Sequence, residues 1–198
     1  MKLWIKICGL TTDEGVAAAL AADVDAIGFV FASSKRRVTP AQAVQLTRDV
    51  PSHLPRVAVM LHPEQSLVDE VWRIFRPDVL QTDAQDLETL KIPAGITVLP
   101  VLRGGAVPDV LPARLLFEGP VSGTGITADW TQAANLSTRT QLILAGGLNA
   151  ANVAAAIREV RPFGIDVSSG VERGPGIKDP ARIHEFVQAA RNAAGTAE

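Results

Sequence analysis

The chain has 198 residues, of which 47% are hydrophobic and 20% are charged, and its formal net charge is −2 at pH 7. This length and composition predict a single globular domain over residues 1–198. The small net charge gives no electrostatic basis for a nucleic-acid or membrane partner, and no apolar segment approaches the roughly 20 residues that span a bilayer. The single cysteine excludes an internal disulfide, and acidic residues closely follow the first apolar run. We therefore expect no signal peptide and a cytoplasmic location.

Short segments rich in β-branched and aliphatic residues recur along the chain and predict strands at 3–8, 26–31, 56–61, 79–82, 97–102, 114–118, 141–144 and 163–168. Helix-like segments stand between them at 12–24, 39–50, 65–75 and 149–160. The connection at 103–113 is short and contains two prolines and two glycines, which predicts a reduced helix there. This alternation predicts an α/β protein, a compact (β/α)8 TIM barrel, with a doubly wound open sheet as the alternative.

The only cysteine, Cys8, ends the first predicted strand, where barrel enzymes place catalytic groups. Because side chains alternate along a strand, Lys6 and Cys8 share one face, which we expect to point into the barrel. A lone cysteine is often no more than a small buried hydrophobe, so its position alone leaves the function of Cys8 open.

Glycine-rich turns follow the last two predicted strands. Gly146 and Gly147 lie in "LILAGGLNAANV", and Ser168, Ser169 and Gly170 lie in "IDVSSGVE". In barrels these two loops frequently bind phosphate, because backbone N–H groups converge there and glycine lets the anion approach. We therefore predict a phosphate site in these loops, to which "SGTG" at 122–125 could also contribute, although glycine and serine also serve simply as turn residues.

Five segments together resemble successive motifs of the phosphoribosylanthranilate isomerase family of tryptophan biosynthesis. They are "KICGLT", "DAIGFVFASSKRRVTP", "SGTGITADW", "LAGGLNAANV" and "IDVSSGVERGPGIKD", and they span nearly the whole chain in the family's order. The resemblance implies a (β/α)8 barrel and a cofactor-free Amadori rearrangement. In it, N-(5-phosphoribosyl)anthranilate becomes 1-(2-carboxyphenylamino)-1-deoxyribulose 5-phosphate by general acid–base catalysis. The implied partner is this small phosphosugar substrate, and we expect a monomer or a homodimer.

The resemblance assigns Cys8 as the general base and places Glu118 where the family's aspartate acts as general acid. Glutamate supports the same chemistry, although its extra methylene moves the carboxyl by about 1.5 Å at most, and displacements near 1 Å can weaken catalysis. Lys6 is a candidate for favouring the thiolate, because positive charge lowers a thiol pKa. Snorkelling, or pairing with a barrel carboxylate, is an equally good interpretation of Lys6.

Three further residues match binding positions of the family. Arg36 falls where the family binds the anthranilate carboxylate, a task that suits a guanidinium fork. Asp166 resembles the residue near the sugar hydroxyls. Asp83 replaces a histidine that the family usually has. It could bind a sugar hydroxyl, act as a competing acid or cap the segment "AQDLETL", and we favour the cap or a minor binding role.

Other functions are compatible with the same residues. Indole-glycerol-phosphate synthases and ribulose-phosphate epimerases use the same phosphate loops, although the synthase needs lysines at strand ends and only Lys6 lies within a predicted strand. A non-catalytic phosphosugar-binding protein is the alternative from another class. The three histidines form no metal pattern, so we expect neither a metal nor a cofactor.

Overall fold

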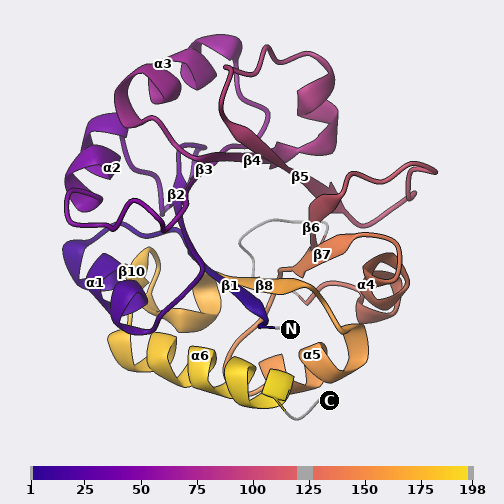
Figure 1. Cartoon of the computed structure of the whole chain (residues 1–198). Coiled ribbons are helices and arrows are strands. Elements are labelled where there is room, and N and C mark those ends of the chain that lie inside the picture. Colours follow the sequence, from indigo (N-terminus) through magenta and orange to yellow (C-terminus); the bar gives the residue numbers. More distant parts are fainter. Residues whose placement is uncertain (1, 120–126, 196–198) are drawn as a thin grey trace.

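The computed structural model describes residues 2–119 and 127–195. Eight parallel strands form a closed barrel in sequence order (Figure 1), and β1 pairs with both β2 and β8 to complete it. The predicted barrel is therefore confirmed and the open sheet is excluded. The strands are β1 Trp4–Cys8, β2 Ala26–Val30, β3 Arg56–Val59, β4 Val79–Asp83, β5 Thr97–Arg103, β6 Arg114–Glu118, β7 Gln141–Leu144 and β8 Gly164–Val167.

Helices surround the barrel on its outside (Figure 1). Side chains in front of several of them accept hydrogen bonds from amides of the first turn. Thr12 accepts one from the Gly15 amide at 3.1 Å, and Thr39 forms a capping box with Gln42. The helices are α1 Asp13–Ala21, α2 Pro40–Leu46, α3 Gln65–Phe75, α4 Trp130–Ser137, α5 Val153–Val160 and α6 Pro180–Gly195.

Two of the βα units are reduced. Residues 104–113, all of them described, contain no helix between β5 and β6, which confirms the prediction for that connection. Between β4 and β5 the chain forms only a 3-10 helix, η1 Ala84–Glu88. Asp83 stands at the N-cap position of η1, but the expected capping role is wrong, because its side chain makes no capping hydrogen bond and instead accepts one from Arg103.

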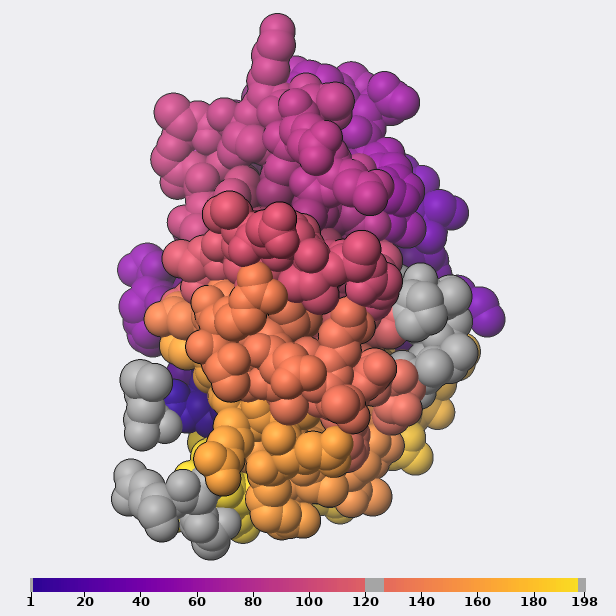
Figure 2. Space-filling model, turned by 90° about the vertical axis from the view of Figure 1, so that its right-hand side faces the viewer, coloured from indigo at the N-terminus to yellow at the C-terminus, as the bar shows by residue number. Residues whose placement is uncertain are grey.

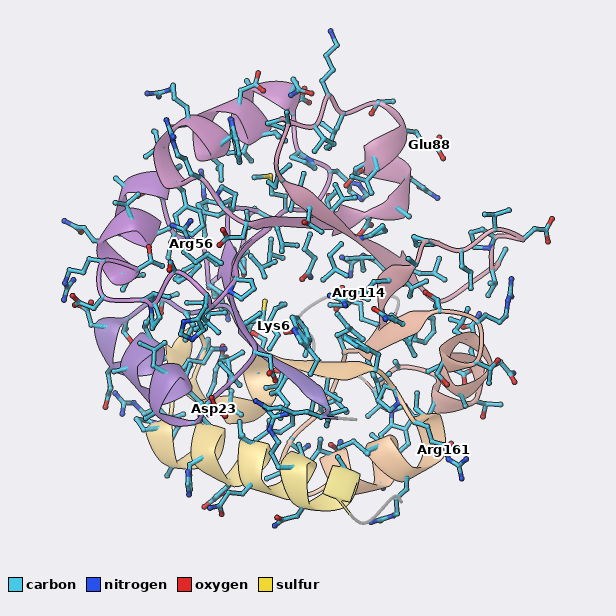
Figure 3. All side chains as sticks on the ribbon, in the orientation of Figure 1. Lys6, Asp23, Arg56, Glu88, Arg114 and Arg161 are labelled. Atoms are coloured by element: carbon cyan, nitrogen blue, oxygen red, sulfur yellow. The ribbon has the colours of Figure 1, made fainter. Side chains whose placement is uncertain are left out.

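Apolar side chains fill two layers. The larger one lies between the strands and the helices, and a smaller cluster fills the inside of the barrel with Leu99, Val101, Leu116, Ile143 and Ala145. Figure 3 shows Lys6 inside the ring of strands and Asp23, Glu88 and Arg161 outside it. Seen from the side in Figure 2, the segments lie against one another in chain order.

The loop after β8 carries an additional small structure. It contains the 3-10 helix η2 Ser169–Val171 and an antiparallel pair, β9 Glu172–Gly174 and β10 Ile177–Lys178. This hairpin brings two charged residues, Glu172 and Lys178, back to the end of the barrel. Among the described residues, no helix is both long enough and apolar enough to cross a membrane.

Candidate active site

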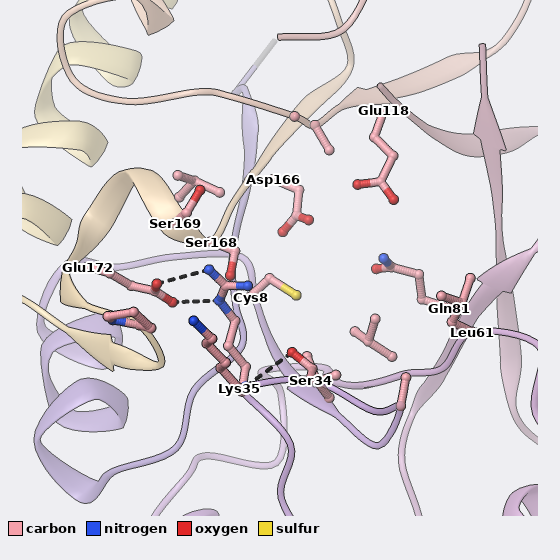
Figure 4. A pocket seen from close by; sticks show the side chains of 18 of the residues that line it. Cys8, Ser34, Lys35, Leu61, Gln81, Glu118, Asp166, Ser168, Ser169 and Glu172 are labelled. Atoms are coloured by element: carbon pink, nitrogen blue, oxygen red, sulfur yellow. Dashed lines mark hydrogen bonds and ion pairs between the residues drawn. The ribbon is translucent and has the colours of Figure 1, made fainter. Parts of the chain in front are cut away.

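A cavity of about 640 Å³ opens at the carboxyl ends of the strands (Figure 4). This is the end at which barrel enzymes bind their substrates. Eight of the ten predicted site residues line it, whereas Asp83 and Gly170 are not among its lining residues. The eight are Cys8, Arg36, Glu118, Gly146, Gly147, Asp166, Ser168 and Ser169.

Cys8 lines this cavity, and two neighbouring glycines leave room for the cysteine and for Arg36. Cys8 ends β1, and its register partner on β2 is Gly28. A methyl group at Gly28 would lie 3.1 Å from Cys8 Sγ and 3.3 Å from Lys6 Nζ. Gly9 has a φ of +73°, and a methyl group there would lie 2.6 Å from Arg36 Cδ. Glycine follows the cysteine because the turn needs this conformation and because Arg36 passes close to the backbone.

A buried ion pair lies below the thiol. Lys6 Nζ is 2.8 Å from Asp166 Oδ1, and the two side chains are 0% and 9% exposed. Burial lowers the pKa of Lys6, but the Asp166 carboxylate and Cys8 raise it, and the net direction is upward. The interpretation that Lys6 pairs with a carboxylate inside the barrel is therefore confirmed.

The thiol itself is held mainly in its neutral form. Burial raises the pKa of Cys8 and outweighs the lowering effect of Lys6, while the Asp166 carboxylate raises it further. The expectation that Lys6 favours the thiolate is correct in sign. The lowering of the thiol pKa by Lys6 is smaller than the rise caused by burial, because the ammonium is already paired with a carboxylate.

The predicted carboxylate-binding arginine is already held by a carboxylate of the protein. Arg36 donates from Nε and Nη2 to the two oxygens of Glu172 at 2.7 and 2.9 Å. Glu172 also accepts from Lys178 Nζ at 2.9 Å, and that lysine donates to the Ser168 carbonyl. Glu172 therefore holds the Nε and Nη2 edge of the Arg36 guanidinium and does not contact Nη1. Sequence reasoning missed Glu172 and Lys178, although "VERGPGIKD" contains both.

The loops after β7 and β8 meet closely enough to require glycine. Gly146 and Gly147 have φ values of 89° and 65°. A methyl group on Gly170 would lie 1.9 Å from the Leu148 carbonyl oxygen, so the β8 loop packs directly on the backbone of the β7 loop. Gly170 does not line the cavity, but it allows the two loops of the predicted phosphate site to pack against each other. The segment 122–125 lies outside the described residues.

The proposed acid lies in a row of charged groups across three strand ends. Arg103 on β5 is the register partner of Glu118 on β6, and its Nη1 hydrogen-bonds to Glu118 Oε1. Its Nε donates to Asp83 Oδ1 on β4 at 2.8 Å. Sequence reasoning missed Arg103 because the predicted strand ended one residue earlier. Alternation from Val101 would have placed Arg103 on the inner face.

One more polar group faces the cavity from β4. Gln81 lines it and is 5% exposed, and its Oε1 has no hydrogen-bond partner among the described residues. Figure 4 shows its amide pointing into the space near Cys8 and Asp166. A buried amide oxygen needs a partner, so Gln81 is suited to accept a hydrogen bond from a bound substrate. In the described part of the chain, no three His, Cys, Asp or Glu side chains are grouped so as to hold a metal.

Comparisons with known proteins agree on one family. The family model described as N-(5'phosphoribosyl)anthranilate (PRA) isomerase matches residues 5–189. N-(5'-phosphoribosyl)anthranilate isomerase from Mesorhizobium japonicum is 37% identical, with coverage of 98% of this chain and 97% of the relative. The enzyme of that name from Streptococcus pneumoniae (strain Hungary19A-6) is 39% identical, with coverage of 93% and 94%.

Solved structures give the same result. The crystal structure of TrpF from Jonesia denitrificans superposes with a TM-score of 0.81 at 36% identity, covering 97% of this chain and 98% of that one. A phosphoribosyl anthranilate isomerase in complex with reduced 1-(o-carboxyphenylamino)-1-deoxyribulose 5-phosphate gives a TM-score of 0.80 at 29% identity, with coverage of 96% and 99%.

Proposed function

Because this chain belongs to the N-(5'-phosphoribosyl)anthranilate isomerase family of tryptophan biosynthesis, we propose that it isomerises its substrate with Cys8 as base and Glu118 as acid. One observation carries the assignment of roles. Cys8 of β1 and Glu118 of β6 line the same cavity, which also contains the glycine-rich loops after β7 and β8. An acid and a base that reach one sugar are what an aldose–ketose rearrangement requires.

The proposed reaction is balanced by two proton transfers. Glu118 donates a proton to the furanose ring oxygen as the bond from C1 to that oxygen breaks, which leaves an iminium between C1 and the anthranilate nitrogen. Cys8 then removes the proton from C2, and the resulting enolamine tautomerises to the ketone. The substrate gains one proton on the former ring oxygen and loses one from C2, so its formula is unchanged. Exchange with solvent returns a proton to Glu118 and removes one from Cys8, which restores both groups for the next turnover.

The charges around Cys8 determine how readily it acts as a base. Its raised pKa means that the thiolate is the minor form at neutral pH, and Lys6 and Lys178 are the cations that favour this form. Asp166 opposes them, yet it also holds Lys6 in place at 2.8 Å. We infer that Asp166 serves mainly to orient Lys6 beneath the thiol and, with Gln81, to bind the sugar hydroxyls.

The two ends of the proposed substrate carry anions, and the cavity offers a separate site for each. The Nη1 edge of Arg36 is suited to the anthranilate carboxylate, because Glu172 holds the other edge of the guanidinium. The loops with Gly146, Gly147 and Ser169 are suited to the phosphate. These sites hold the sugar between the acid and the base.

The test is turnover measured by the loss of anthranilate fluorescence. Cys8→Ser keeps nearly the same volume but removes the accessible thiolate, and we expect kcat to fall about 10²–10⁴-fold with substrate binding retained. Glu118→Gln removes the transferable proton, and we expect a fall in the same range. Near-normal kcat in either variant would remove that residue from the mechanism. If the wild-type protein only shifts the fluorescence stoichiometrically, the chain is a phosphosugar-binding protein.

Two expectations extend beyond the site. One solved structure, 28% identical, is of monomers generated from the dimeric phosphoribosylanthranilate isomerase of Thermotoga maritima. For this chain we keep the prediction of a monomer or a homodimer, which light scattering would distinguish. The cytoplasmic location also stays a prediction, and cell fractionation would test it.

A further inference from the structure

The charged row Asp83, Arg103 and Glu118 poses a chemical problem for the proposed acid. Arg103 donates to Glu118 Oε1, and an adjacent guanidinium stabilises the charged form of a carboxylate. A general acid must instead carry a proton. An arginine placed directly on the acid therefore opposes catalysis unless another group competes for the guanidinium.

The competing group is present on the next strand. Asp83 Oδ1 accepts from Arg103 Nε at 2.8 Å, so the guanidinium lies between two carboxylates. The three side chains are only 13% to 17% exposed, so water screens these interactions weakly. Arg103 and Glu118 line the cavity, whereas Asp83 is not one of the lining residues.

The other charged neighbours in the described part of the chain do not provide the same competition. His62 Nε2 is 3.8 Å from Asp83 Oδ2, and its Nδ1 binds Asp86 at 2.8 Å. From the other strands, Lys6, Cys8 and Asp166 face the same space, but Lys6 and Asp166 are paired with each other. Within the described residues, Asp83 is thus the carboxylate that contacts the guanidinium on the side away from Glu118.

We propose that Asp83 is a positioning residue that binds Arg103, and that this competition allows Glu118 to hold the proton it donates. The proposal rests on the proposed role of Glu118 as acid. It gives Asp83 a function at the position where the family's histidine is expected, and it explains why an aspartate there is accompanied by an arginine at the end of β5.

The test measures the pH midpoint at which the Glu118 carboxyl loses its proton, by carbon NMR of protein labelled at the glutamate carboxyl carbons. The spectrum of Glu118→Gln assigns the signal. In Asp83→Asn, Arg103 binds Glu118 alone, and we expect the midpoint to fall by about one unit and kcat at neutral pH to fall about tenfold. In Arg103→Gln the cation is lost, and we expect the midpoint to rise by about one to two units.

A double variant separates action through Arg103 from a direct effect of the Asp83 charge. In Asp83→Asn/Arg103→Gln we expect the midpoint of Arg103→Gln alone, because Asp83 has no guanidinium left to bind. Arg56→Gln removes an arginine that pairs with Asp78 at 3.1 Å, at the opposite end of the barrel, and should leave the midpoint unchanged.

The outcomes also separate this proposal from the proposed function. A midpoint that is unchanged in Asp83→Asn, or lower in the double variant than in Arg103→Gln, overturns the positioning role even if Glu118→Gln is inactive. Normal kcat in Glu118→Gln together with an inactive Asp83→Asn overturns both, because the acid is then Asp83. A merely structural role for Asp83 would change the unfolding free energy without moving the midpoint.

Discussion

Replacing Lys6 by methionine tests whether the buried ion pair supports both the fold and the thiol. The variant leaves the Asp166 carboxylate without the ammonium that lies 2.8 Å from it, in a place where the two side chains are 0% and 9% exposed. At this separation and an effective dielectric constant of about 20, the attraction between the charges is about 6 kcal/mol. Part of it is offset by desolvation of the two ions, and removing one partner of a buried pair costs about 3–5 kcal/mol.

That loss is a large fraction of the roughly 5–15 kcal/mol that stabilises a typical domain. We expect urea unfolding of Lys6→Met to show it as a lower free energy of unfolding. The variant Lys6→Met/Asp166→Asn, which leaves no unpaired charge, should recover most of the loss. The pKa of Cys8 should also rise further in Lys6→Met, because Lys6 is a cation that lowers it. Ultraviolet titration of the thiolate would follow that change. A loss below about 1 kcal/mol, or a lower thiol pKa, would refute the reasoning.

Three further predictions concern the loops and the arginine. Gly170→Ala brings a methyl group within 1.9 Å of the Leu148 oxygen and should weaken inorganic phosphate binding at least about tenfold by calorimetry. Gly195→Ala, at the end of α6, meets nothing within 4 Å and should leave phosphate binding unchanged. Burial raises the pKa of Glu172, but Arg36 and Lys178 lower it, and the net pKa is below the usual value for glutamate. Ionised Glu172 therefore stabilises the fold above the ordinary carboxyl pKa, and this contribution is lost as the pH falls through the lowered pKa. Glu172→Gln should therefore flatten the unfolding free energy against pH in acid, and an unchanged slope would contradict this. Arg36→Met should raise KM about 10-fold or more with a smaller effect on kcat, and equal affinity for a carboxyphenylamino product analogue would show that the carboxylate binds elsewhere.

The sequence by itself predicted the alternation of strands and helices and the barrel that the strands form. Alternation along the first strand put Lys6 and Cys8 on one face, because side-chain direction in a strand follows from local geometry. The glycine pair after β7 and the single glycine after β8 predicted a phosphate site in these loops, since glycine marks positions where the backbone turns or is closely approached. The segment 65–75 was predicted with the bounds that α3 has in the structure.

Only the tertiary structure decided which charged groups meet. The strand register places Arg103 opposite Glu118, and closure of the barrel places Lys6 beside Asp166, which is 160 residues away. Asp83 was interpreted as a cap from its neighbours in sequence, but its partner lies 20 residues further along the chain. Burial, which raises the pKa of Cys8 despite the nearby ammonium, is also a property of the closed barrel. Electrostatic interactions depend on distances and solvent exposure that exist only once the strands have paired, so no local pattern determines them.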